Sequence, residues 1–389
     1  MRIGAPCETQ DGETRVALTP NVLPLLIRDG HSVVIQSGAG QRARFPDSAF
    51  ERAGAHLVRD AQTLYDQADV VFRVLPPRED QSTGLHEAGM MREGSVCMGL
   101  LAPLDHLDVI DIFARRRITS YALEYVPRIS RAQSMDALTS MATVAGYKAM
   151  ILAAERLDKM CPLLMTAAGT ITPANVLVLG AGVAGLQAIA TAKRLGARVE
   201  AFDPRSAVRE QVQSLGARFL EMEAAADAET TGGYAREQSE AFLQRERDTI
   251  AQRLPEMDVV ISTAQVFGKR APLLMTAEMV SRMHPGAVIV DLAAEHGGNC
   301  ERTQPGSEIE CDGVRIIGAT NLPTRVPFDA SQLYARNLVN LFRYIYPATG
   351  APLGPDDEIV QGTCVTRDGD IVHPAVLAAA ESLRKGALV

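Results

Sequence analysis

The stretch NVLVLGAGVAGLQAIATAKRLGARVEAFD, residues 175–203, carries the clearest prediction about the fold of this chain. An apolar run, Val176–Leu179, leads directly into the glycine-rich segment 180–185, and a helical pattern and a second apolar run ending at Asp203 follow. A strand, a glycine-rich turn, a helix and a second strand in this order form the dinucleotide-binding unit of doubly wound sheets. The stretch therefore predicts a Rossmann domain.

The three glycines of the segment have different physical roles. Gly180 allows the tight turn, Gly182 lets the backbone approach a pyrophosphate, and Gly185 lets the helix pack closely on the sheet. With the helix beginning at about Val183, its unpaired N–H groups and its dipole favour an anion at this point. A glycine-rich structural turn is the alternative interpretation, which the acid at the end of the second strand disfavours.

That acid is Asp203, which follows Gly180 by 203 − 180 = 23 positions, close to the expected spacing of about 20. A carboxylate at this point accepts hydrogen bonds from the ribose hydroxyls of NAD and repels the 2′-phosphate of NADP. Arg205, after Pro204, leaves an alternative open, since a nearby arginine can bind that phosphate, stack on adenine or face solvent. The carboxylate of Asp203 therefore predicts NAD(H) as the cofactor.

The rest of the chain alternates strands and helices, which is typical of parallel, doubly wound sheets. We predict an α/β fold of two such domains, the second a Rossmann NAD-binding domain inserted into the first. The first domain is expected to comprise residues 1–137, completed by 328–389, and the Rossmann domain residues 138–327. A helix is predicted over Asp329–Phe342, capped by Asp329 or Ser331, and a hairpin with Asp368-Gly369 at its turn. The expected strands are His31–Gln36, Ala68–Val74, Ser95–Leu100, Ile118–Tyr121, Val176–Leu179, Val199–Phe202, Val259–Ser262, Ala287–Asp291 and Val314–Gly318.

Composition excludes several classes of function. The net charge is −8, with no basic cluster for nucleic acid, and six scattered cysteines form no CxxC pair, which favours reduced thiols in a cytosolic compartment. We predict no metal site, signal peptide or membrane span. The uncharged stretch between Lys159 and Lys193 is interrupted by prolines and glycines too often to be a lipid-spanning helix.

Beyond the Rossmann motif, several segments resemble the soluble alpha-1 subunit (domain I) of proton-translocating nicotinamide nucleotide transhydrogenases, within the alanine dehydrogenase/transhydrogenase superfamily. The similarity extends along almost the whole chain. The segments are ETRVALTP, PRISRAQSMDALTS (residues 127–140), MTAAGTITPANVLVLGAGVAGLQAIATAKRLGA, TTGGYARE, DLAAEHGGNC, ATNLPTRVPFDAS and GTCVTRDGDIVHP.

This resemblance implies roles for particular residues. Segment 127–140 would be the nicotinamide loop, with Arg128, Gln133 and Asp136 shaping the hydride-transfer site. Tyr234, after Gly233, would lie on a loop that closes over NAD(H), and Thr139, often serine in the family, keeps the hydroxyl. Surface ion pairs for Arg128 and Asp136 and an ordinary loop tyrosine are the alternatives. The full set of expected cofactor-binding residues is Arg128, Ile129, Ser130, Arg131, Gln133, Asp136, Thr139, Gly180, Gly182, Val183, Gly185, Asp203, Pro204, Arg205, Gly233 and Tyr234.

The resemblance also implies partners. Hydride exchange between two nicotinamide rings needs no acid–base side chain, and the single dinucleotide motif implies that NADP(H) is bound by a partner, the beta subunit. Membrane-spanning subunits would couple the reaction to proton movement, and the chain would be a cytoplasmic, peripherally membrane-associated homodimer. Two alternatives remain. One is a self-contained alanine-type amino-acid dehydrogenase, for which the lysine and histidine are missing, although Arg15 could bind a carboxylate and Arg73 could replace the charge of the lysine but not its readily tuned pKa. The other is a regulatory NAD(H) sensor.

Overall fold

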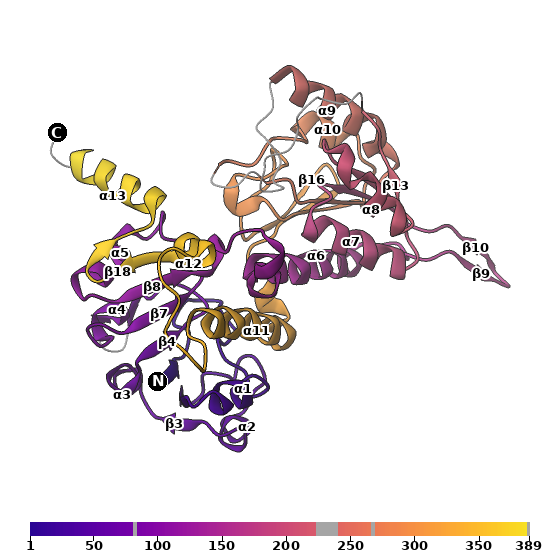
Figure 1. Ribbon diagram of the computed structural model, residues 1–389. Coiled ribbons are helices and arrows are strands. Elements are labelled where there is room, and N and C mark those ends of the chain that lie inside the picture. Colours follow the sequence, from indigo (N-terminus) through magenta and orange to yellow (C-terminus); the bar gives the residue numbers. More distant parts are fainter. Residues whose placement is uncertain (81–83, 223–239, 266–268, 387–389) are drawn as a thin grey trace. The chain divides into compact units, whose positions relative to one another are not determined.

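A computed structural model describes residues 1–80, 84–222, 240–265 and 269–386. The chain divides into two compact units (Figure 1). Unit 1 contains Met1–Met141 and Pro323–Val389, and unit 2 contains Ala142–Leu322. Unit 2 is thus inserted in the sequence of unit 1.

Unit 2 is built on a seven-stranded sheet in the order β13-β12-β11-β14-β15-β17-β16. The first six strands are parallel and β16 is antiparallel to β17. This is the strand order of a dinucleotide-binding sheet, with the switch point between β11 and β14. The strands are β11 (Asn175–Leu179), β12 (Arg198–Phe202), β13 (Arg218–Phe219), β14 (Val259–Ser262), β15 (Val288–Asp291), β16 (Glu308–Cys311) and β17 (Val314–Gly318).

Helices cover both faces of this sheet, because its strands are apolar on both sides and each face needs a cover. Val176 and Val178 point into one core cluster, and Leu177 and Leu179 point into another. The helices are α6 (Ala137–Arg156), α7 (Val183–Arg194), α8 (Arg209–Ser214), α9 (Glu240–Arg253) and α10 (Ala277–Ser281).

Unit 1 repeats the same winding in the order β19-β18-β8-β7-β4-β1-β2-β3. The strands from β3 to β8 are parallel, and β18 and β19 add an antiparallel edge. Its switch point lies between β1 and β4. The strands are β1 (Arg2–Ala5), β2 (Ser32–Gln36), β3 (His56–Val58), β4 (Val70–Phe72), β7 (Val96–Gly99), β8 (Thr119–Ala122), β18 (Cys364–Arg367) and β19 (Asp370–Ile371), with a separate pair β5 (Glu79–Asp80) and β6 (Leu85–His86). The helices are α1 (Leu23–Arg28), α2 (Asp47–Arg52), α3 (Ala61–Gln67), α4 (Glu87–Met90), α5 (Leu107–Arg115), α11 (Pro327–Ile345), α12 (Glu358–Thr363) and α13 (Pro374–Gly386).

The predicted pair of doubly wound parallel sheets is therefore confirmed, with antiparallel strands added at one edge of each. The predicted hairpin forms between β18 and β19, with Asp368 and Gly369 both at positive φ in its turn. The prediction of a side-chain cap for α11 was wrong. The helix begins at Pro327, whose fixed φ and missing N–H suit the first helical position, and no side chain caps it. Ser331 is buried and accepts a hydrogen bond from Val16 N instead.

Helix α6 is long and apolar enough to cross a membrane by length and composition, which on its own is weak support for a span. Within unit 2 its apolar residues belong to a buried cluster with strands of the sheet, which explains its composition. At Gly146 an added Cβ would lie 2.0 Å from the carbonyl oxygen of Ala184. This glycine is required because α6 and α7 cross at backbone contact.

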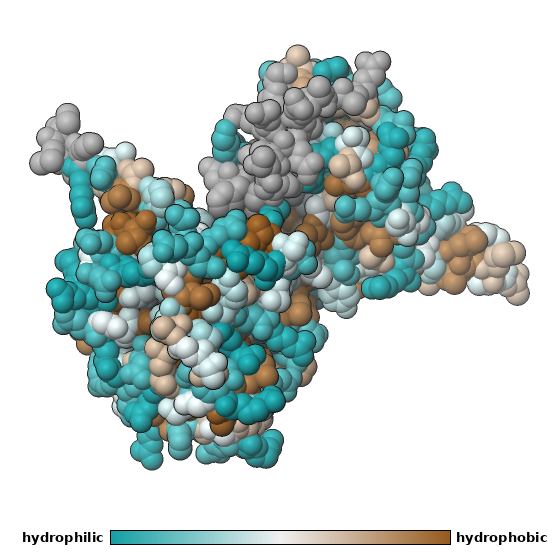
Figure 2. All heavy atoms as spheres, in the orientation of Figure 1, coloured by the Kyte–Doolittle hydropathy of each residue, from teal (hydrophilic) through white to brown (hydrophobic). Residues whose placement is uncertain are grey.

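A two-stranded hairpin, β9 (Leu164–Thr166) and β10 (Gly169–Ile171), extends from unit 2 and exposes apolar side chains, shown brown in Figure 2. The exposed fraction reaches 80% at Met165, with Leu163 and Ile171 also exposed. An isolated hairpin is marginally stable in water. The exposed apolar residues suit a surface that another protein covers.

Candidate functional site

The glycine-rich turn of unit 2 joins the carboxyl end of β11 to α7, beside the switch point. Gly180 has φ +94°, and an added Cβ there would lie 2.7 Å from Oγ1 of Thr263, the residue after β14. The same hydroxyl donates a 3.0 Å hydrogen bond to Gly180 O. At Gly185 an added Cβ would lie 1.8 Å from Gly180 O. These two glycines are therefore required by the protein's own packing.

Gly182 differs, because an added Cβ would meet no atom of the described residues within 4 Å. The residue precedes α7 as its N-cap and makes no side-chain capping bond. The N-cap residue thus offers no side chain to the first N–H groups of the helix, next to space that glycine leaves open among the described residues. A pyrophosphate fits this chemistry, since it needs backbone donors and a close backbone approach.

Asp203 follows β12 and is 5% exposed. Its Oδ2 accepts a 2.7 Å hydrogen bond from Ala181 N, which ties the end of β12 to the glycine-rich turn. Both of its oxygens accept from the Arg205 guanidinium at 2.9 Å, and Arg205 N also donates to Oδ1. The Arg205 side chain therefore forms an ion pair with Asp203, an arrangement that was not among the alternatives considered from the sequence.

Segment 127–140 lies in unit 1 and forms a short 3-10 helix, Ser130–Met135, followed by the start of α6. Asn337 and Asn340, on α11, donate hydrogen bonds of 2.9 and 3.1 Å to Ser134 O. Arg131 forms ion pairs with Asp357 and Glu358. The segment is thus anchored on α11 and next to α12.

Within this segment Arg128, Ser130 and Gln133 are exposed and Ile129 is half-buried. Asp136 acts as the N-cap of α6, where its Oδ1 accepts from Thr139 N at 2.8 Å and its Oδ2 from Thr139 Oγ1 at 2.6 Å. The Asp136 carboxylate therefore has a structural role in addition to the expected functional one. Gly233 and Tyr234 lie outside the described residues.

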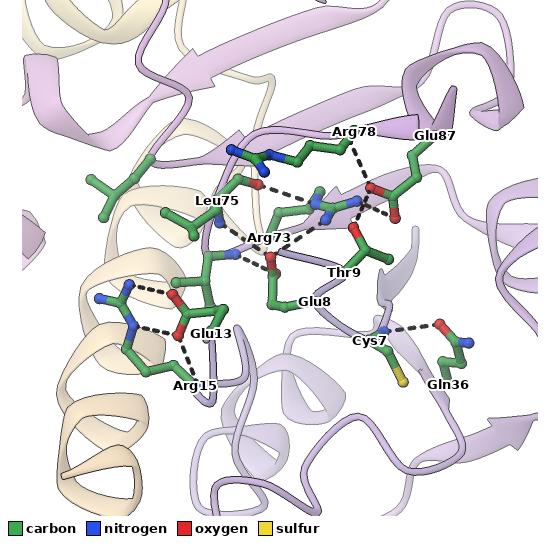
Figure 3. A network of polar contacts seen from close by, with 12 residues as sticks. Cys7, Glu8, Thr9, Glu13, Arg15, Gln36, Arg73, Leu75, Arg78 and Glu87 are labelled. Carbon is green, nitrogen blue, oxygen red and sulfur yellow. Dashed lines mark hydrogen bonds and ion pairs between the residues drawn. The ribbon is translucent and has the colours of Figure 1, made fainter. Parts of the chain in front are cut away.

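Sequence reasoning missed a buried ion cluster at the switch point of unit 1 (Figure 3). Arg73, after β4, is 1% exposed and pairs with Glu87 at 2.7 Å and Glu8 at 3.4 Å. Tyr65 accepts a 2.8 Å hydrogen bond from Arg73, and Glu8, after β1, accepts from Val74 N at 2.7 Å. Its members are separated in sequence, so no local motif indicated the cluster.

The protonation states in this cluster follow from its burial and charges. Burial acts to lower the pKa of Arg73, but Tyr65, Glu8 and Glu87 hold it well above the ordinary value. Burial raises the pKa of Glu8, and Arg73 opposes that rise. The guanidinium thus stays charged between two acids.

Arg15, the cation considered for a substrate carboxylate, is also buried and paired. Its Nε and terminal nitrogen donate to the two Glu13 oxygens at 2.8 and 2.6 Å. Both candidate arginines of unit 1 are therefore neutralised by carboxylates of the chain itself (Figure 3).

A surface hollow of about 610 Å³ lies at the opposite edge of the unit 1 sheet, where β1, β2 and β4 begin. Its lining includes Met1, His31, Asp69 and Arg92. Ligands of doubly wound sheets bind outside the carboxyl ends of the strands, so this hollow is on the wrong edge for such a site.

Fold and site together define a dinucleotide-binding protein of two doubly wound domains. Models of the family Alanine dehydrogenase/PNT match residues 4–145 with its N-terminal domain and residues 149–374 with its C-terminal domain. The chain belongs to this family, whose members bind NAD(H).

Proteins of two kinds are among those similar to this chain. The chain is 48% identical over 380 residues to a chain of Rhodospirillum rubrum that forms the first portion of its NAD(P) transhydrogenase subunit alpha, and the match covers 97% of this chain and 99% of the relative. It is 30% identical over 389 residues to an alanine dehydrogenase of Halomonas elongata, covering 97% and 96%. The crystal structure of transhydrogenase from Sinorhizobium meliloti superimposes with a TM-score of 0.83 at 39% identity, covering 96% of this chain and 100% of that one. The resemblance to transhydrogenase alpha subunits is confirmed.

Proposed function

We propose that this chain is the NAD(H)-binding subunit of a proton-translocating transhydrogenase, and that it passes hydride between NADH and NADP bound on a partner subunit. The observation that favours this function over alanine dehydrogenation is the buried ion cluster of unit 1. Arg73 pairs with Glu8 and Glu87, and Arg15 pairs with Glu13. An oxo-acid carboxylate would have to displace an internal carboxylate to reach either arginine.

The chemistry that remains needs binding and orientation. The reaction NADH + NADP⁺ ⇌ NAD⁺ + NADPH moves a hydride between two ring carbons and releases no proton at them, so an acid–base pair is unnecessary. Rate enhancement comes from holding the two rings in contact with water excluded.

The residues of the chain divide into two roles in this proposal. The glycine-rich turn and the first turn of α7 hold the pyrophosphate, and Asp203 faces the ribose. Arg128, Gln133 and Asp136 orient the nicotinamide end. Since Asp136 is already fixed by Thr139, its carboxylate is held in one orientation before the dinucleotide binds.

The proposed partners are an NADP(H)-binding beta subunit, membrane-spanning subunits that couple hydride transfer to proton movement, and a second copy of this chain. The exposed apolar side chains of the β9–β10 hairpin support a homodimer. Replacing Met165 by glutamate should convert the dimer to monomer in light scattering coupled to gel filtration, and an unchanged mass would exclude this hairpin.

The assignment is tested by mixing the purified chain with NADH and an NADP-loaded beta-subunit domain while following NADPH formation. A parallel reaction contains pyruvate and ammonium in place of the partner. Turnover that requires the partner supports the proposal, and turnover with pyruvate and ammonium alone overturns it in favour of an amino-acid dehydrogenase. NADH binding without turnover in either reaction would instead favour an NAD(H) sensor.

A further inference from the structure

Helix α9 carries a glutamate where its packing calls for an apolar residue. Phe242, Glu246 and Ile250 recur at four-residue spacing and form its buried stripe, with exposed fractions of 2%, 3% and 0%. Ile250 belongs to an apolar cluster that includes Phe202. A fully buried glutamate is rare without a partner, and within the described part of the chain no hydrogen bond or ion pair reaches this carboxyl.

The position of Glu246 relates it to the dinucleotide site. Phe202, which shares a cluster with Ile250, immediately precedes Asp203, and Glu246 lies one helical turn from Ile250. Burial, and after it the nearby Asp203 charge, raise the pKa of Glu246 to about 7, and Arg247 opposes the rise. Arg247 itself pairs with Glu240. Within the described residues, the charges that face Glu246 are thus Asp203 from the end of β12 and Arg247 from its own helix.

The charge balance at this end of the sheet depends on Glu246. Arg205 and Asp203 form an ion pair whose charges cancel, and Asp203 also accepts from Ala181 N. An arginine beside the second strand can accommodate a 2′-phosphate, so the Asp203–Arg205 pair by itself rejects NADP weakly. An ionised Glu246 adds a negative charge that Arg205, already paired with Asp203, does not cancel.

We propose that Glu246 is a specificity-determining residue, a second carboxylate that makes the ribose end of the site reject the 2′-phosphate of NADP(H). The inference rests on the proposed NAD(H) site and deepens it. Transhydrogenation requires the two nucleotides to stay on different polypeptides, and NADP(H) bound on this chain would occupy the NADH site. Since Glu246 gains its proton near neutral pH, the rejection weakens as the pH falls.

The test compares the full-length wild type with Glu246→Gln, which keeps the shape and removes the charge. Isothermal titration calorimetry with NAD⁺ and with NADP⁺ gives the two dissociation constants at about pH 6 and about pH 8.5. At the higher pH the variant should bind NADP⁺ roughly tenfold more tightly than wild type, with NAD⁺ affinity within about twofold. At the lower pH the difference should be smaller, because wild-type Glu246 is then largely protonated.

Two controls isolate the charge. The 2′-phosphate itself titrates near pH 6, and the ratio of variant to wild type at each pH cancels that effect. Glu278→Gln removes an exposed acid from α10 in the same unit and should change neither constant. Glu246→Asp retains the charge and should still reject NADP⁺, which separates charge from packing; thermal melts establish that each variant is folded.

The outcomes distinguish this inference from the proposed function. An unchanged NADP⁺ affinity in Glu246→Gln, or a parallel change for NAD⁺ and NADP⁺, would overturn the role of Glu246 while leaving the NAD(H) site intact. Failure of wild type to bind NAD⁺ would overturn the proposed function and this inference with it.

Discussion

Alanine at Gly182 and alanine at Gly185 should have opposite consequences, although both glycines belong to one motif. The Gly185 Cβ would lie 1.8 Å from Gly180 O, whereas contacts in real proteins are at least 3.0 Å. Helix α7 must therefore separate from the turn by about 3.0 − 1.8 = 1.2 Å. Overpacking of this kind costs about 1–3 kcal/mol, and a backbone oxygen cannot rotate away, so we expect a loss near the upper end.

In Gly182→Ala the new methyl meets no atom within 4 Å in the part of the chain that the structure describes, and the backbone there, φ −75° and ψ −168°, is open to alanine. The loss of a favourable N-cap residue and the reduced entropy of the unfolded chain nearly offset each other, so stability should stay within about 1 kcal/mol. The new methyl occupies the space proposed for pyrophosphate. Losing one or two hydrogen bonds to a charged group, about 1.5–3 kcal/mol each, should weaken NADH binding roughly 100-fold.

Thermal unfolding followed by circular dichroism measures the first effect, and titration of NADH fluorescence measures the second. The expected pattern is a folded Gly182→Ala that binds NADH poorly and a destabilised Gly185→Ala. Gly182→Ala with NADH affinity within about threefold of wild type would refute the proposed pyrophosphate site. Equal destabilisation by both substitutions would refute the packing argument.

Three further predictions concern unit 1. Glu87→Ala removes one of the two carboxylates that neutralise the buried Arg73 guanidinium, and urea unfolding should show a loss of about 3–5 kcal/mol in the free energy of unfolding. A loss below about 1 kcal/mol would mean that Glu8 alone is enough to neutralise Arg73. Asp136→Asn keeps a capping side chain and thermal stability. Because the carboxylate is proposed to orient the nicotinamide, transhydrogenation with the partner should fall at least about tenfold while NADH still binds. A normal rate would mean that Asp136 only caps the helix. Burial raises the pKa of Glu124 from 4.5 to about 7. The folded state therefore holds this proton more tightly, and stability should fall by at most about 3 kcal/mol as pH rises from about 4.5 to 7. Urea unfolding at several pH values should show a smaller loss of stability with rising pH in Glu124→Gln than in wild type. Identical pH profiles of the two proteins would mean that Glu124 is not the group responsible.

Local sequence determined the parts of this protein whose physical causes are local. The run from Asn175 to Asp203 predicted a strand, a turn and a helix, because apolar strand residues and glycines act on their own backbone. The same holds for the Asp368-Gly369 turn, where both residues adopt positive φ. Alternation of strand and helix was sufficient to predict two doubly wound sheets.

Tertiary structure decided which side chains meet. Glu8, Arg73 and Glu87 are separated by up to 79 positions (87 − 8), and their pairing follows from the neighbouring positions of β1 and β4 in the sheet. In the sequence, Glu246 is one of several charged residues of a helix. Only the packing of α9 places it in the buried core, near Asp203. The antiparallel pairing of β18 with β8 also depends on a segment that is distant in the sequence. Which charged side chains meet is decided by the assembled sheet, and the periodicity within one helix or strand carries no information about partners on other elements.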